Sequence, residues 1–202
     1  MQPDLWKFEN EVRRQGFTLI AGVDEAGRGP LAGPVVSAAV ILPDDFDAPG
    51  INDSKKLTPR KRDRLYDQIT EGARSAGVGI VDNLTIDKIN ILQAALLSMA
   101  HAAGQLDPVP DFLLIDGTFT TPADIKQKAI PKGDSLSISI AAASIIAKVT
   151  RDRLMAEYHL QYPEYGFDRH KGYPTKAHKE AIARYGISPI HRLTFKGVKE
   201  YV

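Results

Sequence analysis

Four acidic residues occupy positions where a carboxylate is costly unless cations or hydrogen-bond donors surround it. Asp24 and Glu25 directly follow the apolar run LIAGV. Asp116 follows FLLI, and Asp134 precedes an apolar stretch that begins near Ser135. A buried carboxylate loses its hydration, so it must be paired or bound to a positive charge. If the two apolar strands are neighbours, Asp24 and Asp116 approach each other at one edge of a sheet, and Asp134 can point to the same place.

Clustered carboxylates repel one another and therefore need cations to be stable at neutral pH. These motifs contain no histidine or cysteine, so the ligands would all be oxygen, a set that favours Mn²⁺ or Mg²⁺. Two such ions about 4 Å apart would clamp the attacking and leaving oxygens of a phosphodiester. Taken singly, each acid is more commonly a turn former or helix cap, and Asp134 before Ser135 is a good cap candidate.

A glycine-rich segment, GVDEAGRGPLAGPV, surrounds the first two acids at residues 22–35. Gly27, Gly29 and Gly33 permit tight turns and close approach of the backbone to a ligand. Arg28 supplies a fork of donors that stays charged. Such a loop would let backbone groups reach a sugar or phosphate at the cleavage position. Its pattern matches neither the dinucleotide-binding fingerprint nor the P-loop.

Strands and helices alternate along the chain, which predicts an α/β layer structure. Apolar runs predict strands at 17–24, 34–42, 77–81, 112–115 and 127–130. The first two strands are joined by about ten residues without a helical pattern, so we expect an antiparallel hairpin and a mixed sheet. Capping residues predict helices from Thr58 to about Arg74, from Thr85 to about Ala103 and from Thr175 to about Tyr185. A long helix, apolar first and charged later, is expected at about 135–158.

Composition narrows the class of protein. The 202 residues suffice for one domain with a sizeable core. Cysteine is missing from the sequence, which excludes disulfides, zinc–thiolate sites and cysteine nucleophiles. Neither a signal-peptide-like apolar segment nor a run of roughly 20 apolar residues is present, so no membrane association is expected. Residues 1–144 carry 15 Lys and Arg against 19 Asp and Glu, whereas residues 145–202 carry 11 against 6. A basic C-terminal segment fits a protein that grips a polyanion.

Five blocks of the sequence, taken in order, resemble the ribonuclease HII family. They are GVDEAGRGPLAGPV at 22–35, DSKKL at 53–57, IDG at 115–117, KGDSLSISIAAASIIAKVTRDR at 132–153 and HKGYPTKAH at 170–178. The resemblance extends over about residues 17–195, and WKFENEVRRQG near the N-terminus is similar to the bacterial branch. It implies a ribonuclease H-like fold, with a mixed five-stranded sheet flanked by helices and a small C-terminal helical segment. Residues 1–202 would form one catalytic domain, in which about 160–202 are a substrate-binding extension.

The same resemblance assigns roles to individual residues. It implies that Asp24, Glu25, Asp116 and Asp134 form the active site, with the first three as direct metal ligands and Asp134 helping to hold a second ion. It implies that Gly27, Arg28 and Gly29 recognise the ribonucleotide 2′-hydroxyl, the group that marks RNA within a duplex.

Tyr173 aligns with the family tyrosine that stacks on the sugar of the next, deoxy, nucleotide. A ribose there would crowd the ring, so Tyr173 would select an RNA-to-DNA junction. Ser54, Lys55 and Lys56 precede a predicted helix N-terminus, which is a natural phosphate site, although a solvated loop is the alternative.

The implied reaction is hydrolysis of the phosphodiester 5′ to a ribonucleotide, by two metal ions, leaving a 3′-hydroxyl and a 5′-phosphate. The implied substrates are RNA–DNA hybrids and DNA duplexes with embedded ribonucleotides, bound by a cytoplasmic monomer that a replication clamp could recruit. Three other readings stay open: a nuclease of the same fold acting on DNA alone, a binding module with a vestigial site, and a phosphatase with Asp24 as nucleophile.

Two further groups of polar residues have open roles. Lys148, Arg151 and Arg153 in the long helix either follow a nucleic-acid backbone or form the solvated end of the helix. Three histidines are expected to be surface residues or to bond the backbone, rather than to act as general acids or metal ligands: His170, His178 and His191.

Overall fold

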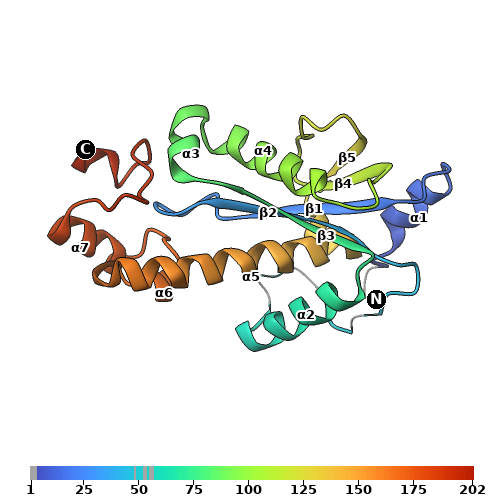
Figure 1. Cartoon of the computed structure of the whole chain (residues 1–202), viewed down its shortest axis with the longest axis horizontal. Coiled ribbons are helices and arrows are strands. Elements are labelled where there is room, and N and C mark those ends of the chain that lie inside the picture. The colour runs from blue at the N-terminus through green and yellow to red at the C-terminus, as the bar shows by residue number, and fades with distance from the viewer. Residues whose placement is uncertain (1–3, 48, 52–53, 55–56) are drawn as a thin grey trace.

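A five-stranded mixed sheet forms the centre of the protein, as predicted (Figure 1). This computed structural model describes residues 4–47, 49–51, 54 and 57–202. The strand order is β3-β2-β1-β4-β5. The strands are β1 (Ile20–Ala26), β2 (Val35–Ile41), β3 (Ser75–Val81), β4 (Phe112–Asp116) and β5 (Lys126–Ile130). β1 and β2 form the expected antiparallel hairpin, whereas β1 and β4 run parallel.

Helices cover both faces of this sheet (Figure 1). On one face lie α3 (Asn83–Ile89) and α4 (Ile91–Gly104), and on the other lie α2 (Pro59–Gly72) and the long α5 (Ile138–Gln161). α1 (Lys7–Arg13) lies at one end of the sheet. Side chains alternate along β1, so Val23 packs in the cluster with Met99 of α4, while Ile20 packs in the cluster with Ile140 of α5.

The sheet and α5 approach each other unusually closely at Gly22. A Cβ on this residue would overlap the backbone of Ser139, so only glycine lets β1 cross α5 at this distance. The buried carboxylate of Glu9 in α1 accepts hydrogen bonds from the hydroxyls of Ser137 and Ser139, each at 2.6 Å. Both contacts fix the beginning of α5, and with it the segment that carries Asp134.

The C-terminal segment forms a smaller body with its own apolar core. It contains η3 (Pro163–Tyr165), α6 (Phe167–His170), α7 (Lys176–Tyr185) and η4 (Lys199–Tyr201), at the end of α5 that lies far from α1 (Figure 1). Phe167 and Ile182 are fully buried there, in one cluster with Leu31 and Ala32 from the loop after β1. The glycine-rich loop therefore packs against the C-terminal segment.

The helix boundaries confirm some sequence predictions and correct others. Thr58 and Thr175 cap α2 and α7 as predicted. The helix expected from Thr85 to about Ala103 is wrong, because it is two helices, α3 and α4, separated by Asn90 at φ 67°. Asp82, not Thr85, caps α3, by accepting a hydrogen bond from the Thr85 amide at 2.8 Å. Within the described ranges, none of the helices is both long and apolar enough to cross a membrane.

Candidate active site

Three carboxylates meet at the carboxyl ends of β1 and β4. Val23 pairs with Ile115 in the parallel register, so the next residues, Asp24 and Asp116, lie side by side at the end of this pairing. Oxygen atoms of Asp24, Glu25 and Asp116 all lie within 4.8 Å of one another. The prediction that the first and fourth strands bring their acids together is confirmed.

Asp134 lies beside this group rather than at the start of the long helix. It belongs to η2 (Gly133–Ser135), is buried, and its backbone amide donates a hydrogen bond to Oδ1 of Asp116 at 3.3 Å. The reading of Asp134 as the cap of the long helix is wrong, because Ser137 caps α5 by accepting from the Ile140 amide. A separate turn thus carries Asp134 to the edge where the other three acids lie.

The donor set fits a hard divalent cation. Every ligand atom in the group is a carboxylate oxygen, and Asp24 is almost completely buried, where a bound cation would stabilise the charge of the clustered acids. A cavity of about 270 Å³ opens beside the group and is lined by Glu25, Arg28, Asp116 and Lys132, together with apolar residues of α4. A phosphate could therefore reach the carboxylates through a space that also contains two cationic side chains.

The glycine-rich loop begins directly after the carboxylates. Nη1 of Arg28 lies 3.3 Å from Oε1 of Glu25, so the loop and the acidic group are in contact. Gly27 has φ 101°, and a Cβ there would overlap Nε of Arg151, so this position requires glycine. Gly29 differs, because a Cβ there would only make an ordinary contact, 3.6 Å from the ring of Tyr173. The small size of Gly29 is therefore not required by the protein's own packing.

Tyr173 lies at the edge of this loop. Its side chain is partly exposed, and the close approach of its ring to Gly29 places it beside the segment predicted to recognise the ribose. The amide of Leu31 donates to the carbonyl of Gly172 at 2.8 Å, which joins the two segments through their backbones. Residues far apart in the sequence, 27–31 and 172–173, therefore form one surface.

Sequence reasoning missed the residue that supports the loop, Arg192. Its side chain is fully buried, and its guanidinium donates to backbone carbonyls of the loop that include those of Gly27, Arg28 and Gly33. Burial lowers the pKa of Arg192 to about 9. No motif or periodicity in the surrounding SPIHRLTF indicated this role, because the partners are carbonyls about 160 positions earlier in the chain.

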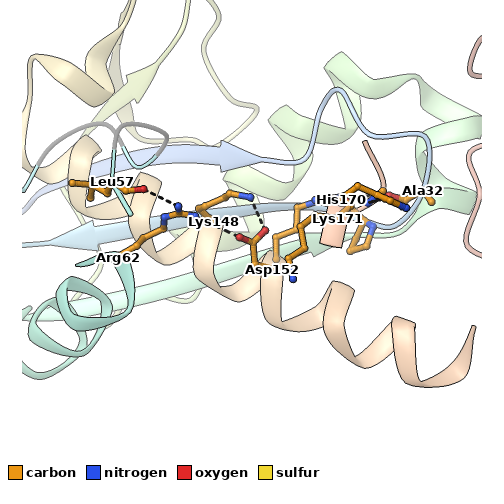
Figure 2. Close-up of polar contacts among 10 residues, drawn as sticks. Ala32, Leu57, Arg62, Lys148, Asp152, His170 and Lys171 are labelled. Atoms are coloured by element: carbon orange, nitrogen blue, oxygen red, sulfur yellow. Dashed lines mark hydrogen bonds and ion pairs between the residues drawn. The ribbon is translucent and has the colours of Figure 1, made fainter. Parts of the chain in front are cut away.

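The three basic residues of α5 do not form a strip of exposed cations. Lys148 pairs with Asp152 at 2.6 Å, and Arg62 of α2 approaches the same carboxylate at 3.5 Å (Figure 2). Arg153 lies over the ring of Tyr66 at 4.3 Å. Arg151 is buried and bonds backbone carbonyls, so for this residue both readings, nucleic-acid contact and solvated helix end, are wrong.

The DSKKL block can be placed only in part. Ser54 is buried, and its amide lies 3.4 Å from the hydroxyl of Ser144 in α5, so this residue packs inward. Lys55 and Lys56 lie outside the described residues. Phosphate contact by this block therefore remains a prediction.

The three histidines bond the backbone and one another, and none of them is a freely exposed group. Nε2 of His178 lies 3.0 Å from Nε2 of His191, and the His170 ring stacks on that of His178. Burial, as the largest cause, lowers the pKa of His178 and His191 to about 4. Both are therefore neutral near pH 7.

Comparison with known proteins agrees with this geometry. A family model described as Ribonuclease HII matches residues 21–198. The chain is 61% identical over 198 residues to the ribonuclease HII of Geobacter metallireducens, covering 98% of this chain and 93% of that protein. The crystal structure of ribonuclease H2 from Pyrococcus horikoshii OT3 is similar with a TM-score of 0.76 and 28% identity, over 91% of this chain and 97% of the other. The ribonuclease HII in a complex with PCNA from Archaeoglobus fulgidus is similar with a TM-score of 0.75 and 28% identity, over 89% and 96% of the two chains. The expected ribonuclease H-like fold is thereby confirmed.

Proposed function

The chain belongs to the ribonuclease HII family of metal-dependent endoribonucleases, and from that premise we propose that it hydrolyses the phosphodiester on the 5′ side of a ribonucleotide. The substrates would be RNA–DNA hybrids and DNA duplexes with embedded ribonucleotides, and the products would end in a 3′-hydroxyl and a 5′-phosphate. One observation carries the proposal. The carboxylates that would bind metal and the loop that would read the sugar are in direct contact, through Arg28 and Glu25.

The carboxylates would hold two divalent ions, Mn²⁺ or Mg²⁺. Asp24, Glu25 and Asp116 would be direct ligands, and Asp134 would help to hold the second ion beside Asp116. When bound, such ions supply an activated water and stabilise the charge on the leaving 3′ oxygen. The residues of the chain position this chemistry, since they come from two adjacent strands and a short turn that the packing of β1 on α5 holds in place.

Recognition of the ribose would fall to the loop and to Tyr173. Gly29 leaves room for a sugar to approach the backbone, while Gly27 and Arg28 would present backbone groups and a guanidinium to the 2′-hydroxyl. Tyr173, whose ring faces the Gly29 position, would stack on the next sugar and favour a deoxyribose there. The contact between the two segments would let them read adjacent nucleotides.

Other segments would bind the parts of the substrate that lie away from the cleaved bond. We propose phosphate contacts from Ser54, Lys55 and Lys56, and duplex contacts from about residues 160–202 as an extension of the single catalytic domain. We also propose a cytoplasmic monomer. The solved complex of the Archaeoglobus fulgidus relative with PCNA supports recruitment by a replication clamp.

The test uses three duplexes of one sequence: all DNA, one embedded ribonucleotide, and an RNA–DNA hybrid. We expect cleavage of the second and third with Mn²⁺ or Mg²⁺, none with chelator, and a single cut 5′ to the embedded ribonucleotide. End-labelling and mass spectrometry of the products identify the 3′-hydroxyl and 5′-phosphate. Equal cutting of the all-DNA duplex would favour a DNA nuclease instead. Release of phosphate from small esters through a covalent aspartyl intermediate would favour a phosphatase.

A further inference from the structure

Two buried arginines hold the glycine-rich loop by its backbone. The guanidinium of Arg192 donates to five carbonyls, at 2.6–3.2 Å, which are those of Gly27, Arg28, Pro30, Gly33 and Pro34. Arg151 donates to the carbonyls of Pro34 and Ala32 and also to that of Lys171. Ala32 and Lys171 are both labelled in Figure 2. Charge-assisted hydrogen bonds of this kind are the strongest in proteins, so the loop has little freedom to change conformation.

Burying two guanidinium groups is unfavourable in itself. Burial lowers the pKa of Arg151 to about 10 and that of Arg192 to about 9, which reflects the lost hydration of both charges. Apolar side chains of similar size would fill the same space without that cost. The two arginines are therefore explained better by what they hold than by general stability of the core.

A second set of bonds runs from the same part of the chain to Tyr173. The amide of Ser188 donates to Nδ1 of His191 at 2.8 Å, so that nitrogen carries no proton and Nε2 of His191 does. His178 must then accept at its own Nε2, 3.0 Å away, and its Nδ1 donates to the carbonyl of Tyr173 at 2.9 Å. Each of these hydrogen bonds therefore fixes the direction of the next one. The last bond is made to the backbone carbonyl of Tyr173.

His191 and Arg192 are consecutive, and the backbone fixes both to the loop. His191 forms a bridge with Ala32, and the amide of Arg192 donates to the carbonyl of Leu31 at 2.8 Å. We propose that His191 and Arg192 form a positioning unit that sets the loop at residues 27–34 relative to Tyr173, and so determines specificity for an RNA-to-DNA junction. This inference rests on the proposed function, in which that loop reads the ribose and Tyr173 reads the following sugar.

The test compares substrates, because a purely structural role would lower all activities together. Arg192→Lys keeps the charge but replaces a planar fork that makes five hydrogen bonds with an ammonium that has three donors. We expect it to reduce kcat at least tenfold on the one-ribonucleotide duplex and clearly less on the hybrid, while Mn²⁺ still raises its Tm as in the parent. Arg14→Lys, at an exposed arginine after α1, is the matched control, and its kcat and Tm should equal those of the parent.

Two substitutions of His178 test the hydrogen bonds that lead from His191 to Tyr173. Asparagine can place an amide donor where Nδ1 of His178 donates, whereas leucine cannot. We expect His178→Leu to lower at least fivefold the ratio of cleavage of the one-ribonucleotide duplex to cleavage of the hybrid, because in the hybrid the sugar after the recognised ribonucleotide is a ribose instead of a deoxyribose. His178→Asn should restore most of that ratio. If Arg192→Lys does not fold, these two variants of His178 test the positioning unit in its place.

The possible results distinguish failure of the proposed function from failure of the positioning unit alone. A parent enzyme that cuts all-DNA duplexes as fast as ribonucleotide-containing ones would reject the proposed function itself. A parent enzyme that discriminates, with folded Arg192→Lys and His178→Leu variants whose kcat and substrate ratios equal those of the parent, would overturn the positioning unit alone. Equal losses on every substrate would also overturn it, because they would indicate support of the fold only.

Discussion

Replacing Asp116 by asparagine should stabilise the metal-free protein while destroying its activity. The oxygens of Asp24, Glu25 and Asp116 lie within 4.8 Å of one another. At that separation each pair of negative charges costs about 1 kcal/mol with water-like screening and about 3 kcal/mol at an effective dielectric constant of 20. Asp116→Asn removes two such pairs and keeps an oxygen that can accept from the Asp134 amide. Since Glu25 and Asp116 are partly exposed, we expect a total gain of about 1–2 kcal/mol.

That gain can be measured as a shift in thermal unfolding. For a domain of this size, about 1–2 kcal/mol corresponds to a rise in Tm of roughly 2–8 °C in chelated buffer. Mn²⁺ at 100 times its Kd should add about 2.7 kcal/mol to the parent, and much less to the variant. Cleavage of the one-ribonucleotide duplex should fall more than about 100-fold, because losing only an outer partner of a metal site costs 10–100-fold. A variant with a lower Tm than the parent in chelated buffer, and with the same rise in Tm on adding Mn²⁺, would refute the role of Asp116 in a repulsive, metal-binding group.

Four further predictions concern the loop, Tyr173 and the two buried histidines. Gly27→Ala should lose at least about 1–3 kcal/mol of stability, because φ 101° strains any side chain. Gly29→Ala should unfold within about 0.5 kcal/mol of the parent yet cut at least tenfold more slowly, and urea unfolding beside activity assays separates the two. Tyr173→Ala should keep hybrid cleavage within a few-fold but lose preference for the one-ribonucleotide duplex, as competition between labelled substrates would show. His178 and His191 have folded pKa values of about 4, below the usual 6.5, so their stabilisation is complete above pH 6.5 and is lost as pH falls towards 4. Free energies of unfolding measured in urea at pH 7 and 5 should differ by up to about 2 kcal/mol for each histidine, and the difference should shrink in His178→Asn; parallel profiles would contradict this assignment.

The sequence was sufficient to predict the group of acids because strand ends and their neighbours are local features. An acid at the end of each of two buried strands already places Asp24 and Asp116 at one edge if those strands pair. The break at Asn90 escaped prediction, since apolar residues continue across it and asparagine tolerates a positive φ that only the folded backbone reveals.

The supports of the loop could not be predicted for a different reason. Arg151 lies in a helical stretch whose charges looked like a solvated end, and Arg192 lies in a segment with no periodicity. Their partners are backbone carbonyls, which every residue has, so no residue type elsewhere in the sequence marks the contact. Only the tertiary arrangement shows that these two charges are buried against the loop.

The dependence of residues 27–34 on Arg192 has a consequence for synthesis of the protein. A ribosome makes the loop about 160 residues before the arginine that holds it, so a nascent chain can build the sheet before it can complete the sugar-reading surface. Until residue 192 has left the ribosomal tunnel, the acids could already bind metal beside a loop without its final shape. Truncated products of interrupted translation would then be metal-binding proteins without selectivity for ribonucleotides.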